Sequence, residues 1–176
     1  MKEFALEDGQ DVNIELLKAH FLPVAEYQKS HQSTVIACHD IIISYQGGLL
    51  LVQREKHPAK GTLWPLGGRI SRGMSTEESL RKKVREESGL ELDEIQELGI
   101  TRTYFSTDPF GHGKGTDTLN VMFYGRGGGI LKLDSWHSKP VIVTPAMDTI
   151  HFKASLHPYV QEMVELGMKI LKEKKG

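Results

Sequence analysis

The chain has 176 residues, a length that fits one domain with a sizeable core better than two. Charged residues make up 26% of it and the formal net charge is −1, so neither a nucleic-acid-binding protein nor one attracted to anionic membranes is indicated. The single cysteine, Cys38, cannot form an intrachain disulfide, and no stretch reaches the roughly 18 apolar residues of a membrane span. We therefore expect a cytoplasmic protein.

The first elements expected along the chain are a short helix and a hairpin. Apolar residues near a helical spacing predict an amphipathic helix over residues 13–21. Residues 33–45 are rich in β-branched side chains, which favour a strand. Gln46-Gly47-Gly48 supplies a turn, and the apolar residues 49–52 resume the strand pattern, so we expect a β-hairpin.

The clearest helix signal begins at Ser75. Ser75 is a good N-cap, and Glu78 three residues later completes a capping box. Leu80 and Val84 lie one turn apart and form an apolar stripe. Gly89 is placed for a left-handed C-terminal cap.

The second half of the chain predicts more strands, two loops and a last helix. The strands are expected near residues 96–106, 117–125 and 139–144. Glycine-rich loops are expected at residues 111–115 and 127–129. An i, i+3, i+4 apolar spacing predicts a helix over residues 156–175. This order of elements indicates an α/β fold in which helices flank a mixed sheet.

The stretch GGRISRGMSTEESLRKKVREESGL, residues 67–90, carries the chemistry. It places two adjacent carboxylates, Glu86 and Glu87, in the last turn of the helix, after a glycine pair that includes Gly68. Carboxylate and carbonyl oxygens suit Mg²⁺ or Mn²⁺, and such an ion can neutralise phosphate oxygens during substitution. The alternative without a functional role is that Glu86 and Glu87 form a solvated acidic turn that pairs with Lys82, Lys83 and Arg85.

The same stretch resembles the Nudix box. Aligned on Gly68, the chain keeps five box positions: Val84, Glu86, Glu87, Gly89 and Leu90. Three positions depart from the box: Met74 replaces a glutamate, Lys82 an arginine, and Lys83 the first glutamate of the metal-binding cluster. A fixed cation at Lys83 should pair with Glu86 or Glu87 and repel a second metal ion. The resemblance implies a Nudix α/β/α sandwich, with a flexible N-terminus of residues 1–12 and a single Nudix domain of residues 13–176.

The flanking sequence LLLVQREKHPAKGTLWPLGGRI is similar to that of GDP-mannose mannosyl hydrolases, a Nudix branch that also lacks a carboxylate at this position. The resemblance covers roughly residues 21–164 with uneven quality. It implies that Arg54 and Arg69 bind the diphosphate, a role that suits the forked guanidinium group. It also implies that Gly68, Glu86 and Glu87 hold one Mg²⁺ or Mn²⁺ ion.

In that branch a histidine near the last helix activates water. The best positional match is His157, with His151 as the second choice, and Glu87 is a further catalytic candidate. Neither histidine has the neighbouring amide side chain that the branch uses. His112, in the loop FGHGKG, is interpreted as an exposed loop residue, and Trp64 as core packing beneath the site.

The sequence therefore predicts a hydrolase of a nucleoside diphosphate linked to another moiety, with GDP-sugars such as GDP-mannose first. The partner is a small-molecule nucleotide rather than a nucleic acid or a membrane, and the resemblance adds a homodimer. Two alternatives stay open. One is pyrophosphohydrolysis with attack at phosphorus, and the other is a Nudix nucleotide-binding module that has lost catalysis.

Overall fold

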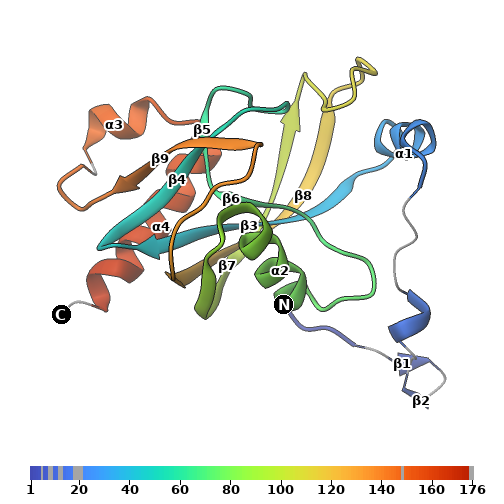
Figure 1. Ribbon diagram of the computed structural model, residues 1–176, viewed down its shortest axis with the longest axis horizontal. Coiled ribbons are helices and arrows are strands. Elements are labelled where there is room, and N and C mark those ends of the chain that lie inside the picture. Colours follow the sequence, from blue (N-terminus) through green and yellow to red (C-terminus); the bar gives the residue numbers. More distant parts are fainter. Residues whose placement is uncertain (5, 8–9, 12–13, 18–21, 148, 175–176) are drawn as a thin grey trace.

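The computed structural model describes the chain except residues 5, 8–9, 12–13, 18–21, 148 and 175–176 (Figure 1). Within its first part lie a pair of two-residue strands, β1 (Leu6–Glu7) and β2 (Gln10–Asp11), and a 3₁₀ turn, η1 (Ile14–Leu17). The amphipathic helix predicted over residues 13–21 is thus a four-residue turn where it is described.

The first α-helix lies further along the chain, in a segment to which the sequence assigned no element. Helix α1 (Val24–His31) begins directly after Pro23, its N-cap residue. A proline is well tolerated at a helix start because the first backbone N–H groups of a helix have no intrahelical partner. The tertiary contacts of α1, described below, explain why a helix of only eight residues forms here.

A mixed seven-stranded sheet forms the centre of the molecule. Its main path runs in the order β5-β4-β3-β8-β7, while β6 pairs with β3 and β9 pairs with β4. Only the β3–β8 pairing is parallel among those described. The strands are β3 (Ile36–Tyr45), β4 (Gly48–Arg54), β5 (Leu63–Trp64), β6 (Leu66–Arg69), β7 (Glu91–Phe105), β8 (Thr116–Gly128) and β9 (His137–Val143).

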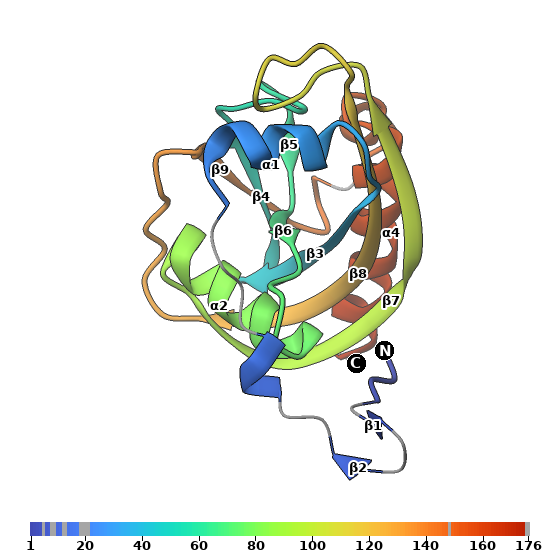
Figure 2. The same cartoon turned by 90° about the vertical axis from the view of Figure 1, so that its right-hand side faces the viewer.

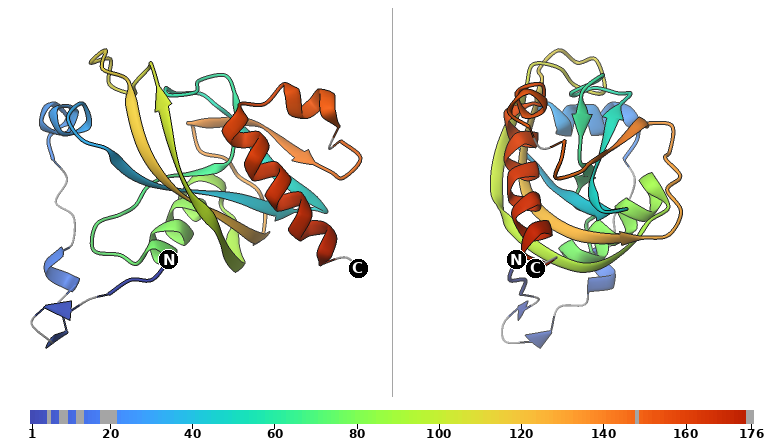
Figure 3. Two further views of the ribbon diagram at one scale, coloured as in Figure 1. Left: turned by 180° about the vertical axis from the view of Figure 1, so that it is seen from behind. Right: turned by 90° about the vertical axis from the view of Figure 1, so that its left-hand side faces the viewer.

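Helices cover both faces of this sheet. Successive residues of β3 point to opposite faces, so Ile42 joins the core beneath α4 (Pro158–Glu173), whereas Ile41 and Ile43 join the core beneath α2 (Thr76–Ser88). Figures 2 and 3 show α2 and α4 on opposite sides of the sheet. The fold is therefore the α/β/α sandwich with a mixed sheet that the sequence predicted.

The ends of the expected elements follow local signals closely in α2 and less closely elsewhere. The Ser75–Glu78 capping box and the left-handed Gly89 cap are both present. Strand β8 continues to Gly128, through part of the expected loop at residues 127–129, because it stays paired with the start of β7. An additional short helix, α3 (Ile150–Ala154), precedes α4. None of the described helices has the length and apolar character needed to span a membrane.

Glycine 67 allows β6 to lie directly against β3. A Cβ atom at this position would lie 2.3 Å from the backbone oxygen of His39 and 2.4 Å from Oδ1 of Asp40, and the φ angle of Gly67 is +151°. Both the contact distances and the backbone angle exclude a side chain.

We predict that Gly67→Ala lowers the free energy of unfolding by about 2–4 kcal/mol, through overpacking and backbone strain. The matched control is Gly128→Ala in β8, because a Cβ atom there meets nothing within 4 Å. It should change stability by less than about 1 kcal/mol. Urea denaturation of both variants tests this, and equal effects would contradict it.

Candidate active site

Two adjoining cavities of about 250 Å³ each open beside the C-terminal half of α2. One, here named the aromatic cavity, has rings in its wall: Tyr27, Trp64, Phe105, Phe110 and Trp136. The other, the polar cavity, has two carboxylates and a histidine in its wall: Glu87, Asp134 and His137. The residues common to both walls are Arg54, Gly68, Lys83 and Trp136.

Arg54 lies where the two cavities meet, at the last position of β4. Its Nε atom is buried and has no hydrogen-bond partner among the described residues. Burial lowers the pKa of its guanidinium, and the nearby carboxylates Asp40 and Glu87 oppose that shift. A buried donor without a protein partner is costly, so this side chain is available for an anionic ligand.

Arg69 reaches the aromatic cavity from the end of β6. Its guanidinium lies 4.2 Å from the ring centroid of Tyr27 on α1, a cation–π contact. The structure therefore brings Arg54 and Arg69, the two predicted diphosphate-binding residues, to the wall of one cavity. Tyr27 was not predicted, because its helix was not.

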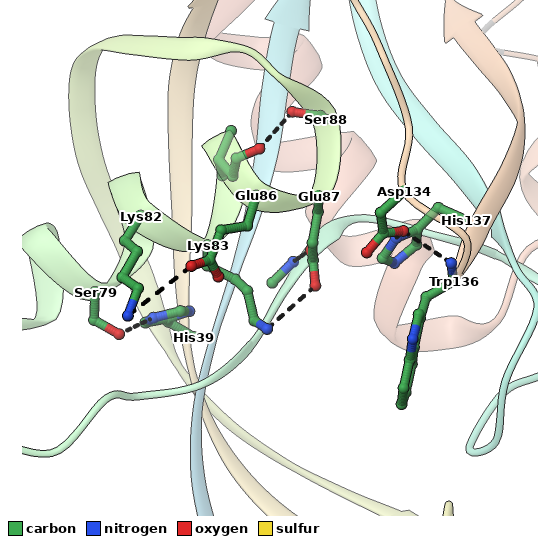
Figure 4. A network of polar contacts seen from close by, with 12 residues as sticks. His39, Ser79, Lys82, Lys83, Glu86, Glu87, Ser88, Asp134, Trp136 and His137 are labelled. Atoms are coloured by element: carbon green, nitrogen blue, oxygen red, sulfur yellow. Dashed lines mark hydrogen bonds and ion pairs between the residues drawn. The ribbon is translucent and has the colours of Figure 1, made fainter. Parts of the chain in front are cut away.

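The predicted carboxylate pair separates into two environments. Glu87 is 7% exposed, accepts a hydrogen bond of 3.2 Å from the backbone N–H of Gly67, and lies 3.6 Å from Nζ of Lys83. Glu86 has a side chain that is 56% exposed, lies 3.9 Å from Nζ of Lys82, and lines neither cavity. Figure 4 shows the two lysine–glutamate pairs side by side on α2. The expected pairing of Lys83 with one of the carboxylates is confirmed.

Glu87 has an unusual protonation equilibrium for a glutamate. Burial raises the pKa of its carboxyl to about 7, although Lys83 and the Gly67 N–H both act to lower it. Asp40, on the wall of the aromatic cavity, is also buried, and its pKa is raised to about 6 even though it accepts a 2.7 Å hydrogen bond from the Tyr159 hydroxyl. Titratable groups shifted toward neutrality in a cavity are typical of functional sites.

The sequence did not single out Asp134 or His137. After β7 and β8, the chain returns to the C-terminal end of α2. There the backbone N–H of Asp134 donates to the Glu87 carbonyl at 3.0 Å. Asp134 and Nδ1 of His137 lie 2.8 Å apart, facing the polar cavity beside Glu87 (Figure 4). Only their i, i+3 spacing could have pointed to this pair, and that signal is weak.

Two histidines contact each other at the aromatic cavity. Nδ1 of His31 on α1 lies 2.8 Å from Nε2 of His112, whose Nδ1 accepts the backbone N–H of Lys114. His112 is not an exposed loop residue: its side chain is 8% exposed. His31 lines the cavity.

The two histidines predicted to activate water lie elsewhere. His157 is the exposed N-cap of α4, where its Nδ1 accepts the backbone N–H of Tyr159. It does not line either cavity, but its ring centroid lies 5.3 Å from that of Trp64, which is both core packing and cavity wall. His151 is exposed on α3 and lines neither cavity.

The predicted metal ligands do not come together. Gly68 and Glu87 share the polar cavity, but Glu86 points away from it, and the Lys83 ammonium adjoins Glu87. Across the part of the chain that the structure describes, no group of three or more His, Cys, Asp or Glu side chains is arranged to hold a metal ion. This donor set does not fit a carboxylate-bound Mg²⁺ or Mn²⁺ ion, which prefers several oxygen ligands.

Known proteins share both the sequence pattern and the fold of this chain. A curated relative, the low-salt glycan biosynthesis protein Agl8 of Haloferax volcanii, is 23% identical over 148 residues, which cover 82% of this chain and 89% of that protein. A NUDIX hydrolase of Nitrosomonas europaea matches with a TM-score of 0.60 and 19% identity, covering 76% of this chain and 88% of that one.

The NUDIX domain of Shewanella oneidensis NrtR, whose structure contains ADP ribose, matches with a TM-score of 0.59 and 20% identity over 85% of this chain and 99% of that one. At these identities the solved structures establish the fold. The model of the NUDIX domain matches residues 15–150. The chain therefore belongs to the NUDIX domain family, the family of the Nudix hydrolases.

Proposed function

We propose that this Nudix hydrolase acts on a nucleoside diphosphate linked to a second moiety, with GDP-sugars such as GDP-mannose as the first candidates. The observation that carries the proposal is the position of Arg54 and Arg69 on the wall of one cavity that also has aromatic rings. Guanidinium groups bind phosphate oxygens in pairs, and rings provide faces for a base or a sugar.

The charge of the aromatic cavity supports this assignment. Three cations line it, Arg54, Arg69 and Lys83, whereas Asp40 is the one carboxylate among its described wall residues. Burial raises the pKa of Asp40 to about 6, so it stays mostly ionised near neutral pH, and the three cations outweigh its single negative charge. A diphosphate would neutralise this excess of positive charge in a partly buried place where Coulomb interactions are strong.

Two relatives point in the same chemical direction. Agl8 is described as a glycan biosynthesis protein, and the NrtR domain was solved with ADP ribose, a nucleoside diphosphate joined to a sugar. Sugar-linked nucleoside diphosphates are therefore the class with which we would begin. The cytoplasmic location and the homodimer expected from the sequence stay predictions, whereas the expected Mg²⁺ or Mn²⁺ ion does not fit the donor set described above.

For the chemical step, Glu87 is our first candidate for proton transfer. Its pKa of about 7 lets it both accept and release a proton at neutral pH, which is the property of an effective general acid or base. His157 stays the candidate for water activation by resemblance, linked to the cavity through Trp64, and His151 is the second.

Hydrolysis in ¹⁸O-labelled water tests the reaction itself. Incubation with GDP-mannose, ADP-ribose and UDP-glucose should give turnover with at least one of them. Label in the released sugar supports attack at carbon, and label in the phosphate supports pyrophosphohydrolysis. If no compound turns over but at least one binds, the binding-module alternative replaces the hydrolase.

We predict that Arg54→Ala weakens binding of the preferred nucleoside diphosphate by about 10–100-fold, the loss typical of a charge-assisted hydrogen-bonding group. Arg54→Lys keeps the charge but loses the fork, so its affinity should fall between those of the wild type and Arg54→Ala. Isothermal titration calorimetry measures all three.

Arg126→Ala is the matched control for the two Arg54 variants. Arg126 is exposed, pairs with Asp93 and Glu94, and lines neither cavity. Its replacement should leave the affinity within about twofold, because an exposed ion pair is weak and distant from the ligand. Equal losses in Arg54→Ala and Arg126→Ala would remove Arg54 from the site.

The raised pKa of the buried Glu87 carboxyl also predicts how the stability of the protein changes with pH. Its pKa rises from an ordinary 4.5 to about 7 in the folded state, so between these values the folded protein holds a proton that the unfolded chain has released. The free energy of unfolding therefore falls as pH rises through this window. Glu87→Gln lacks this penalty, so from pH 5 to pH 8 its stability should improve relative to the wild type by about 1–3 kcal/mol.

Denaturant titrations at pH 5 and pH 8 measure this change. Glu86→Gln is the control, because the Glu86 side chain is 56% exposed and its replacement should have the same small effect at both values. A Glu87→Gln variant whose stability difference from the wild type does not change with pH would contradict the burial argument.

A further inference from the structure

The ammonium group of Lys83 lies where the two cavities of the candidate active site adjoin. Lys83 lines both cavities, as Arg54 and Gly68 do. Its Nζ atom lies 3.6 Å from Oε1 of Glu87, and its side chain is 35% exposed, so the ammonium is paired with protein on one side and accessible on another.

The glycine pair makes room for this lysine. A Cβ atom at Gly68 would lie 3.1 Å from Cε of Lys83 and 3.9 Å from Nζ. The lysine stem therefore extends across the bare backbone of Gly68 and delivers its charge beside the strand that carries Arg69. Gly68 and Glu87, two of the three predicted metal ligands, thus have a lysine ammonium next to them.

A divalent ion at this place would have unfavourable neighbours. Lys83 and Arg54, both fixed cations, line the same polar cavity as Gly68 and Glu87. Each would repel a divalent ion at short range, and Glu86, which would supply further negative charge, pairs with Lys82 away from the cavities. The remaining acids of the polar cavity, Glu87 and Asp134, already face Lys83 and His137 respectively.

A diphosphate meets the opposite situation. Its oxygens are negatively charged and therefore attract Arg54, Arg69 and Lys83. These three cations extend from β4, β6 and α2 into the wall of the aromatic cavity. An ammonium group is a compact donor that binds phosphate oxygens as a point charge. The role that a metal ion would have in neutralising the phosphates can thus be met by a side chain of the protein.

We propose that Lys83 neutralises the bound diphosphate in place of a divalent metal ion, so that this site binds nucleoside diphosphates without metal. The inference rests on the proposed function, since it concerns how the same ligand class is held. It assigns to Lys83 a binding role that differs from that of its neighbour Lys82, although the two are adjacent on one helix.

Calorimetric titration with GDP, ADP and UDP tests the proposal in EDTA and again in excess Mg²⁺. The best-binding nucleotide should show affinities in the two buffers that differ by less than about threefold, because the phosphate contacts are made by protein cations. Weakening by EDTA of about tenfold or more would overturn the proposal. If none of the three binds in either buffer, both this inference and the proposed function fail.

Lys83→Met and Lys82→Met separate the role of Lys83 from general charge. Methionine keeps much of the aliphatic stem and removes the ammonium. Lys83→Met should weaken the EDTA-buffer affinity by about tenfold or more, whereas Lys82→Met should stay within about twofold, because Lys82 pairs with Glu86 outside the cavities. Thermal unfolding of both variants checks that they are folded. Equal affinities for Lys83→Met and the wild type would overturn the proposal.

Discussion

The close approach of β6 to β3 is the constraint on which the site depends. Antiparallel pairing sets Gly67 opposite Asp40 and Gly68 opposite His39, and the missing side chain at Gly67 lets the two backbones meet. The Gly67 N–H in turn donates to the carboxylate of Glu87, which ties α2 to the sheet. One contact between strands thus positions the backbone of the glycine pair, Arg69 at the end of β6 and the last turn of α2, which carries Glu87.

Glu87 illustrates how function and stability oppose each other in this site. It is buried, yet among the described residues its carboxylate has one backbone hydrogen bond and a lysine at 3.6 Å as compensation. Burial raises its pKa despite both contacts, so the ionised form is still disfavoured. An apolar or amide side chain would fit such a place at less cost, and proteins keep such carboxylates mainly where ligand or proton chemistry needs them.

Local signals allowed some parts of this structure to be predicted residue by residue. Ser75, Glu78 and Gly89 determine the ends of α2 through hydrogen bonds within a few residues, so their pattern could be interpreted without knowledge of the fold. The prediction that Arg54 and Arg69 bind a diphosphate came from a resemblance of spacing. The structure adds that both line one cavity, with Arg69 at the end of β6, the strand that pairs with β3.

Long-range contacts account for what the sequence did not reveal. Helix α1 has a weak apolar pattern, and its contacts include the His31–His112 hydrogen bond and the packing of Tyr27 on Phe110, between segments about eighty residues apart. Asp134 and His137 reach the site only because the chain returns to satisfy the last carbonyl groups of α2. The position of His157 at a helix start was predictable, whereas its distance from the cavities was not.

The two adjacent lysines of α2 show why a motif departure must be interpreted in three dimensions. In a sequence comparison Lys82 and Lys83 are two equivalent losses from the Nudix box. On a helix, however, neighbouring residues point about 100° apart, and only residues three or four apart share a face. Lys82 therefore meets Glu86 on the exposed face, while Lys83 meets Glu87 beside the glycine pair. One departure from the box is thus a surface change. The other puts a fixed positive charge, where the Nudix box has a metal-binding carboxylate, beside Glu87 and at the place where we propose that the phosphates bind.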